Sequence, residues 1–124
     1  MLGWMISFYR LPTGQSPETM DASKETPLAR WEVGFDGIDG LDELVKEGKA
    51  TQSRWGGYPN MYTTTAEYAL PMIASGPRAY AGPTVFGDDY VMSPGWKGPE
   101  QINQDLIAAC AAHETIVVTA WDLS

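Results

Sequence analysis

Few side chains in this chain have the chemistry and the spacing that catalysis requires. His113 is the only histidine, which excludes the zinc motifs that need two of them. With its neighbour Glu114 it could form an acid–base pair, since imidazole titrates near neutral pH. A cation at the end of a helix needs no such role, because the helix dipole already favours it there. We therefore expect His113 to cap a preceding helix rather than to act in catalysis.

A nucleophile is equally hard to find. A serine nucleophile would need His113 as its base, and no serine stands in a Gly-x-Ser-x-Gly motif. Cys110 is the only cysteine, and its apolar, helical surroundings should raise the pKa of the thiol. A lone cysteine also excludes an internal disulfide. Because the N-terminal residues lack the pattern of a signal peptide, we expect a cytoplasmic protein. The lack of a suitable nucleophile or acid–base pair favours a protein that is not an enzyme.

Neither a metal nor a cofactor is predicted. The acidic residues between positions 36 and 47 are spaced by about three, whereas an EF-hand needs oxygens at every second position. Asp88 and Asp89 are adjacent acids in a glycine-flanked turn, where such residues are common without a ligand. The run Trp55-Gly56-Gly57-Tyr58-Pro59 is not followed by Lys-Ser/Thr, so it is no phosphate-binding loop.

Aromatic residues are the most distinctive feature. Eight of the 14 lie between positions 54 and 99, a segment that is also rich in glycine and proline. They are Trp55, Tyr58, Tyr62, Tyr68, Tyr80, Phe86, Tyr90 and Trp96. Such residues either fill the core or, on glycine- and proline-shaped loops, form a recognition surface. The predicted partner-binding residues are Trp55, Tyr58, Asp88, Asp89, Tyr90 and Trp96.

The charge balance narrows the class of partner. The chain has 16 acidic and 8 basic residues, a formal net charge of −8. Affinity for nucleic acids and for anionic membranes depends on clustered Lys and Arg, and the basic residues here are scattered. We therefore expect neither nucleic acid nor a membrane as partner. An acidic surface favours a protein with a basic surface, although the same charge also serves solubility.

The elements that would position these residues alternate between strands and helices. Residues 4–11 are predicted to form a strand, and a long loop over 12–27 leads to a second strand at 28–35. In that strand Ala29, Trp31 and Val33 should be buried while Arg30 and Glu32 face outward. A helix is predicted from 39 to 47, with Asp39 as its cap and Gly48 after its end.

The second half carries further signals. Residues 64–67 fit a capping box for a helix that Pro71 should kink or end early. Residues 84–92 could form one strand or a hairpin turning at Gly87-Asp88. Pro99 opens a predicted helix to about residue 112, with Leu106 on its apolar face. Residues 115–121 are a nearly continuous apolar strand, which predicts a central position in the sheet.

Together these elements predict an α+β fold. We expect residues 1–124 to form a single domain, a mixed sheet of about four strands with two or three short helices packed on it. The 54–99 segment should build one side or rim.

The function predicted from these features is that of a small acidic inhibitor that neutralises a protein partner, such as a toxin. Bacterial toxin-immunity proteins and phage-encoded inhibitors are similar in being short, acidic and poor in cysteine; the similarity extends to composition and size alone. One alternative is a small enzyme or ligand-binding domain with a pocket lined by the 54–99 aromatics, with polar groups from Arg54, Asp88, Asp89 or His113. A third is a homo-oligomer that associates through the same aromatics.

Overall fold

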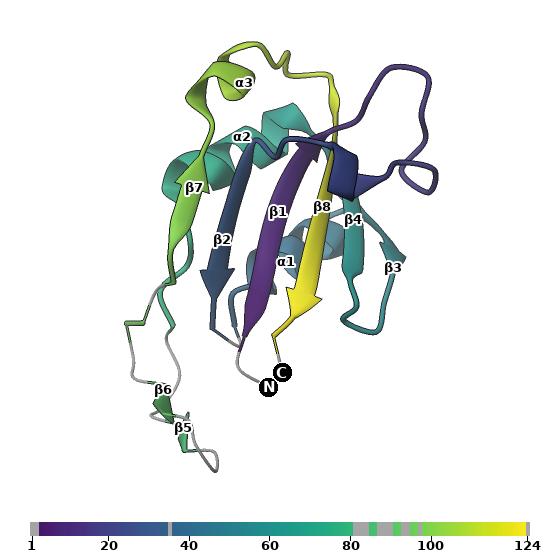
Figure 1. The fold of residues 1–124 in the computed structure, drawn as a ribbon. Helices are drawn as coiled ribbons and strands as arrows, with labels where there is room; N and C mark the ends of the chain where they lie inside the picture. The colour runs from purple at the N-terminus through teal and green to yellow at the C-terminus, as the bar shows by residue number, and fades with distance from the viewer. Residues whose placement is uncertain are drawn as a thin grey trace.

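The fold is built on one antiparallel sheet (Figure 1). The computed structural model describes residues 3–34, 36–80, 85–86, 91–92, 95–96 and 98–123. Within them the strand order is β3-β4-β8-β1-β2-β7, and all neighbouring pairs are antiparallel. The strands are β1 (Trp4–Arg10), β2 (Ala29–Val33), β3 (Thr51–Arg54), β4 (Asn60–Thr65), β7 (Glu100–Ile102) and β8 (Thr115–Asp122). The α+β prediction is confirmed, but six antiparallel strands replace the expected mixed sheet of about four.

Four helical segments accompany the sheet. They are the 3₁₀ turn η1 (Ala22–Lys24), α1 (Asp39–Lys46), α2 (Ala66–Ser75) and α3 (Gln104–Ala108). Figure 1 shows α1 and α2 together behind the sheet. Two short strands, β5 (Val85–Phe86) and β6 (Val91–Met92), pair with each other in a separate hairpin.

One face of the sheet meets the helices in the main core. Along β1 the alternate residues Trp4, Ile6 and Phe8 are buried, as period-two alternation requires. They pack with Leu41 of α1 and Ile73 of α2 in one apolar cluster. The predicted alternation of the second strand is also confirmed, because its Ala29, Trp31 and Val33 belong to the same cluster.

The opposite face carries a smaller core. Tyr9, Met61 and Val117 pack there with Met20, which comes from the long connection between β1 and β2. Arg30 lies on this face as predicted, but it is held in place, since its guanidinium donates to the hydroxyls of Ser7 at 2.9 Å and Tyr9 at 2.8 Å. Strand β8 is therefore covered on both sides, and residues 116–120 are all buried. Its predicted central position is confirmed.

The expected helix over residues 99–112 is wrong. Residues Glu100–Ile102 instead form the edge strand β7, which pairs with β2, and α3 has only five residues. Asn103 sets the boundary, because its side chain accepts a hydrogen bond from the backbone N–H of Leu106 and so caps α3. The apolar residues of this segment recur at helical spacing. Pairing with the edge of the sheet nevertheless gives the backbone N–H and C=O groups of residues 100–102 their hydrogen-bond partners. Leu106 is consequently only partly buried.

The 54–99 segment is not a rim throughout. It contains β4, which lies inside the sheet between β3 and β8. The predicted capping box is also wrong, since Thr64 donates its hydroxyl to the carbonyl of Lys49 at 2.8 Å and Thr65 is the residue at the cap of α2. Pro71 does not end this helix, which continues to Ser75.

Some of the remaining local predictions are confirmed and others are wrong. Helix α1 agrees with its predicted range, and Gly48 follows its end with φ of +74°, the left-handed conformation that glycine adopts freely. Its cap position is Ile38, so Asp39 is instead the first helical residue. Of the 84–92 segment, the structure describes β5 and β6, which pair antiparallel with Phe86 opposite Val91, while the turn predicted at Gly87-Asp88 lies outside the described residues.

Candidate functional site

The structure describes three of the six predicted partner-binding residues, and these three lie in two different parts of the molecule. Trp55 and Tyr58 lie in the connection between β3 and β4, with 69% and 62% of their surface exposed. Trp96 is half-buried, and its carbonyl accepts a hydrogen bond from the backbone N–H of Tyr80, remote in sequence from that connection. Asp88, Asp89 and Tyr90 lie outside the described residues. Of the six, Trp55 and Tyr58 are thus brought together.

The aromatics of the 54–99 segment do not act as one group. Tyr62 is fully buried in the main core and Tyr80 is nearly so. Tyr68 is half-buried beneath the ammonium of Lys49, which lies 5.5 Å from the centre of the ring. Some of these aromatics therefore fill the core, whereas Trp55 and Tyr58 are exposed.

A third exposed aromatic residue, Trp121, joins Trp55 and Tyr58. It lies on β8, one residue before Asp122, whose backbone N–H donates to the carbonyl of Gly57 at 2.7 Å. This hydrogen bond places the end of β8 beside the β3–β4 connection. Among the described residues, these three are the exposed large hydrophobic side chains, with Trp121 at 45%. We call Trp55, Tyr58 and Trp121 the aromatic end.

Sequence patterns could not have found Trp121 as part of this group. It closes a nearly continuous apolar strand, which suggested burial on both faces. Burial stops at Ala120, however, because the strand extends beyond the cores there and Trp121 lies on the face opposite the helices. The one signal available was its position at the end of the apolar run.

The connection between β3 and β4 has a defined shape. Gly56 and Gly57 have φ of +100° and +88°, where side-chain-bearing residues are strained. A β-carbon at Gly57 would also lie 3.2 Å from the β-carbon of Asp122 and 3.7 Å from the ring of Trp4. The buried side chain of Asn60 accepts a hydrogen bond from the backbone N–H of Gly57 at 2.9 Å. These contacts hold Trp55 and Tyr58 on an ordered loop.

A hollow of about 470 Å³ lies beside this loop. Its lining comes from the start of β1, the start of α1, strands β3 and β4, the loop itself and the end of β8. The lining residues are Trp4, Ile38, Asp42, Gln52, Trp55, Gly56, Gly57, Asn60, Tyr62 and Asp122. It combines one exposed indole with two buried rings and two carboxylates. We refer to this cavity as the hollow.

Tyr62 and Asp42 are coupled at the floor of the hollow. The Tyr62 hydroxyl donates to Oδ1 of Asp42 at 3.0 Å. Burial raises the pKa of Tyr62 most strongly, and the negative charge of Asp42 raises it further, although a hydrogen bond with Asn60 acts in the opposite direction. The hydroxyl therefore keeps its proton over the physiological range and orients the Asp42 carboxylate. No local sequence pattern indicates this contact between Asp42 and Tyr62.

The groups considered for catalysis do not assemble a reactive site. His113 is exposed in the connection that follows α3, five residues after that helix ends, so its predicted role as a helix cap is wrong. Neither His113 nor Arg54 lines the hollow. The alternative pocket proposed from the sequence therefore receives its polar groups from other residues, Asp42, Asn60 and Asp122.

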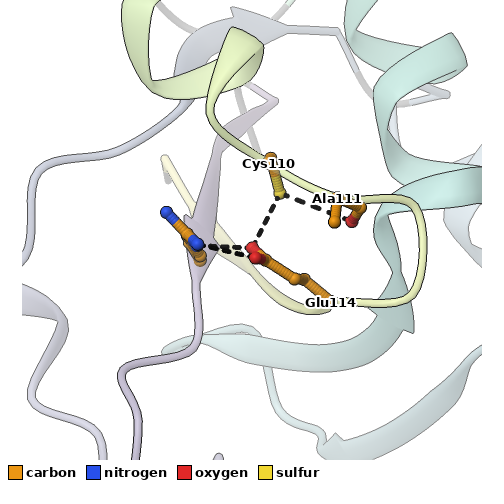
Figure 2. Close-up of polar contacts among 4 residues, drawn as sticks. Cys110, Ala111 and Glu114 are labelled. Atoms are coloured by element: carbon orange, nitrogen blue, oxygen red, sulfur yellow. Dashed lines mark hydrogen bonds and ion pairs between the residues drawn. The ribbon is translucent and has the colours of Figure 1, made fainter.

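Cys110 is held as a thiol (Figure 2). Its Sγ donates to Oε2 of Glu114 at 3.3 Å, and Arg10 forms a salt bridge with the same carboxylate. Burial raises the pKa of Cys110, and the negative charge of Glu114 adds to the shift, while Arg10 partly offsets it. The pKa of Glu114 is itself lowered, first by its hydrogen bond with Arg10. The arrangement disfavours the thiolate that a nucleophile requires, as the sequence predicted.

A second hollow has a different character. About 580 Å³ in volume, it lies where β2 meets β7 and is lined mainly by polar side chains such as Gln101, Gln104 and Asp105. Its one cationic lining residue, Arg30, is already held by two hydroxyl groups. No exposed large aromatic residue borders it among the described residues. The hollow at the aromatic end is therefore the stronger candidate.

Two general features and the comparisons with known proteins complete the description. Over the described ranges, no three side chains of His, Cys, Asp or Glu gather as a metal ion would need, and no helix has the length and apolar character to cross a membrane. No family model, curated protein or solved structure matches this chain. The geometry of the site itself is therefore the basis for inferring a function.

Proposed function

We propose that this chain is a small, acidic, non-catalytic binding protein that neutralises a protein partner with a basic surface. The observation that carries the proposal is the aromatic end, where Trp55 lines the hollow together with the carboxylates of Asp42 and Asp122, and Tyr58 and Trp121 are also exposed. Large aromatic side chains supply much of the binding energy at protein interfaces, and surrounding charge steers the encounter. Toxin-immunity proteins and phage-encoded inhibitors are the proposed functional class.

The order of the loop supports this assignment. The backbone of the loop that carries Trp55 and Tyr58 is held by the Gly57–Asn60 and Gly57–Asp122 hydrogen bonds, so little backbone conformational entropy is lost when a partner covers the loop. Aromatic side chains need few rotatable bonds for a large contact area, which lowers that loss further.

The experiment begins with capture of partners from a lysate of the source cells by the tagged wild-type chain. The captured protein is purified, its own activity is assayed with and without the chain, and binding is followed kinetically. Stoichiometric loss of the partner's activity supports the proposal. Replacement of Trp55 or Trp121 by Ala should weaken binding by about tenfold or more, mainly through faster dissociation. A partner whose activity is unaffected by saturating amounts of the chain contradicts neutralisation.

The sequence-predicted residues Asp88, Asp89, Tyr90 and Trp96 belong to the same proposal. Reversal of both aspartates to Lys should slow association and reduce its dependence on salt, because steering acts on the encounter. Trp96→Ala should instead accelerate dissociation. Glu43→Lys is the control, since Glu43 is exposed in α1 and does not line the hollow. An association rate that depends neither on salt nor on the reversal of Asp88 and Asp89 would contradict electrostatic steering. The excess of acidic residues would then serve solubility alone.

A ligand-binding function is the second candidate, and the hollow itself favours it. Its volume falls within the range of roughly 300–1,000 Å³ that small-molecule sites occupy. A small-molecule function predicts that a low-molecular-weight fraction of the lysate, free of protein, shifts the thermal unfolding of the wild-type chain and not of a Trp55→Ala variant. The same fraction has no effect if the hollow serves a protein partner alone.

A further inference from the structure

We propose that the hollow receives the guanidinium group of an arginine side chain presented by the partner. This inference rests on the proposed function and adds the chemical group that the site recognises. It follows from three properties of the hollow: its charge, its rings and the rigidity of its polar groups.

The charge of the lining has one sign. Asp42 and Asp122 supply two carboxylates, and the lining contains no Lys, Arg or His. The whole chain adds to this local potential through its net charge of −8. A group that enters the hollow displaces water from the half-exposed Asp42 carboxylate, so a neutral group would leave that charge poorly compensated. A cation restores that compensation.

The rings favour a planar cation. The indole of Trp55 is exposed at the rim, whereas Trp4 and Tyr62 are buried and form the floor. A guanidinium group stacks on an indole face and at the same time donates parallel hydrogen bonds to a carboxylate. An ammonium group is a compact, strongly hydrated charge that cannot do both with the same geometry. The combination of Trp55 with two carboxylates therefore selects arginine.

The Asp42 carboxylate is already oriented before a ligand enters. Asp42 is fixed by the hydroxyl of Tyr62, at 3.0 Å. Asp122 lies against Gly57, where a β-carbon would come within 3.6 Å of its Oδ2. The close approach is possible because residue 57 is glycine. Little ordering entropy remains to be lost when the guanidinium binds, which increases affinity for a given set of contacts.

The test uses two small probes of nearly the same shape. Capped arginine (N-acetyl-arginine N-methylamide) and capped citrulline, its neutral isostere, are titrated separately into the ¹⁵N-labelled full chain. The readout is the indole N–H signal of Trp55 together with the backbone signals of Gly56 and Gly57. We expect saturable shifts with arginine and binding of citrulline that is weaker by about tenfold or more, because the charge-assisted hydrogen bonds are lost.

Matched variants locate the binding. Asp42→Asn and Asp122→Asn should each weaken arginine binding several-fold, and Trp55→Ala should do so without affecting the fold, since Trp55 is exposed. Asp42→Asn keeps an acceptor for Tyr62, so the floor of the hollow is preserved. Glu43→Gln removes one charge outside the hollow and should leave arginine binding unchanged. A dispersed spectrum of each variant confirms that it is folded.

Three outcomes would overturn the inference: equal binding of arginine and citrulline, equal binding of capped lysine, or no saturable shift at the loop with any probe. A neutral sugar that binds in preference to arginine would also overturn it. Failure of the proposed function is recognised separately. A partner that is neutralised equally well by the wild type and by the Asp42→Asn/Asp122→Asn double variant contradicts the arginine site alone, whereas arginine binding without any neutralised partner contradicts the proposed function alone.

Discussion

The hydroxyl of Tyr62 offers a direct test of how the floor of the hollow is held together. Tyr62→Phe removes the donor to Asp42 and changes little else in the fully buried ring. A hydrogen bond to a charged acceptor contributes about 1.5–3 kcal/mol, but Asp42 is half-exposed and can accept from water in the variant. At pH 8 we therefore expect the free energy of unfolding to fall by about 1–2 kcal/mol.

The difference between wild type and variant should depend on pH. Because the folded state raises the pKa of Tyr62 above its ordinary value of 10.0, the folded chain keeps a proton that the unfolded chain releases. The stability from this group is thus complete below pH 10 and is lost as the pH rises above it. With the folded hydroxyl still protonated at pH 11, one proton of difference amounts to about 1.4 kcal/mol. The wild type should lose this amount between pH 8 and 11, and Tyr62→Phe should not.

The assay is urea unfolding of both proteins at several pH values between 8 and 11, followed by circular dichroism. The two free energies of unfolding should converge as the pH rises, while titration of other groups affects both proteins alike. Asp42→Asn should show a smaller loss with pH, because burial still raises the pKa of Tyr62 but the charge of Asp42 no longer does. A constant difference between wild type and Tyr62→Phe from pH 8 to 11 would refute the coupling.

Three further predictions follow from burial and from the polar contacts. Leu41→Ala should lower the free energy of unfolding by about 2–5 kcal/mol, measured with denaturant, because Leu41 is fully buried in the main core. Leu106→Ala should lower it by about 2 kcal/mol or less, because Leu106 is only partly buried. Equal losses for the two variants would contradict the assigned cores. Alkylation of Cys110 by iodoacetamide at pH 8 should be slow and should accelerate several-fold in Glu114→Gln, because loss of the carboxylate lowers the thiol pKa; an unchanged rate would contradict that role of Glu114. His113→Ala should leave the biological activity within a few-fold of wild type, since His113 is exposed and distant in the fold from the hollow's lining, whereas a general acid–base residue would cost about 10²–10⁴ in rate.

Local sequence patterns predicted the elements in which hydrogen bonding and packing match the periodicity of the apolar residues. The alternation within residues 28–35 and the apolar run of residues 115–121 predicted two strands of the sheet, and the central position of the second followed from its two apolar faces. Helix α1 was predicted with its glycine stop because its apolar spacing and its terminal residues indicate the same range. In these segments no distant partner competes with the local preference.

The tertiary structure decided the rest. Residues 100–102 have neighbours at helical spacing, yet they pair with β2 because an open sheet edge offers backbone partners that no local pattern reveals. The candidate site was likewise decided by the tertiary structure. Asp42, Trp55 and Asp122 are separated by long stretches of chain, and they line one hollow because β4 and β8 are neighbours and β8 ends beside Gly57. Composition alone indicated an acidic, aromatic-rich binding protein, but only strand order could bring its aromatic and acidic side chains to one end of the sheet.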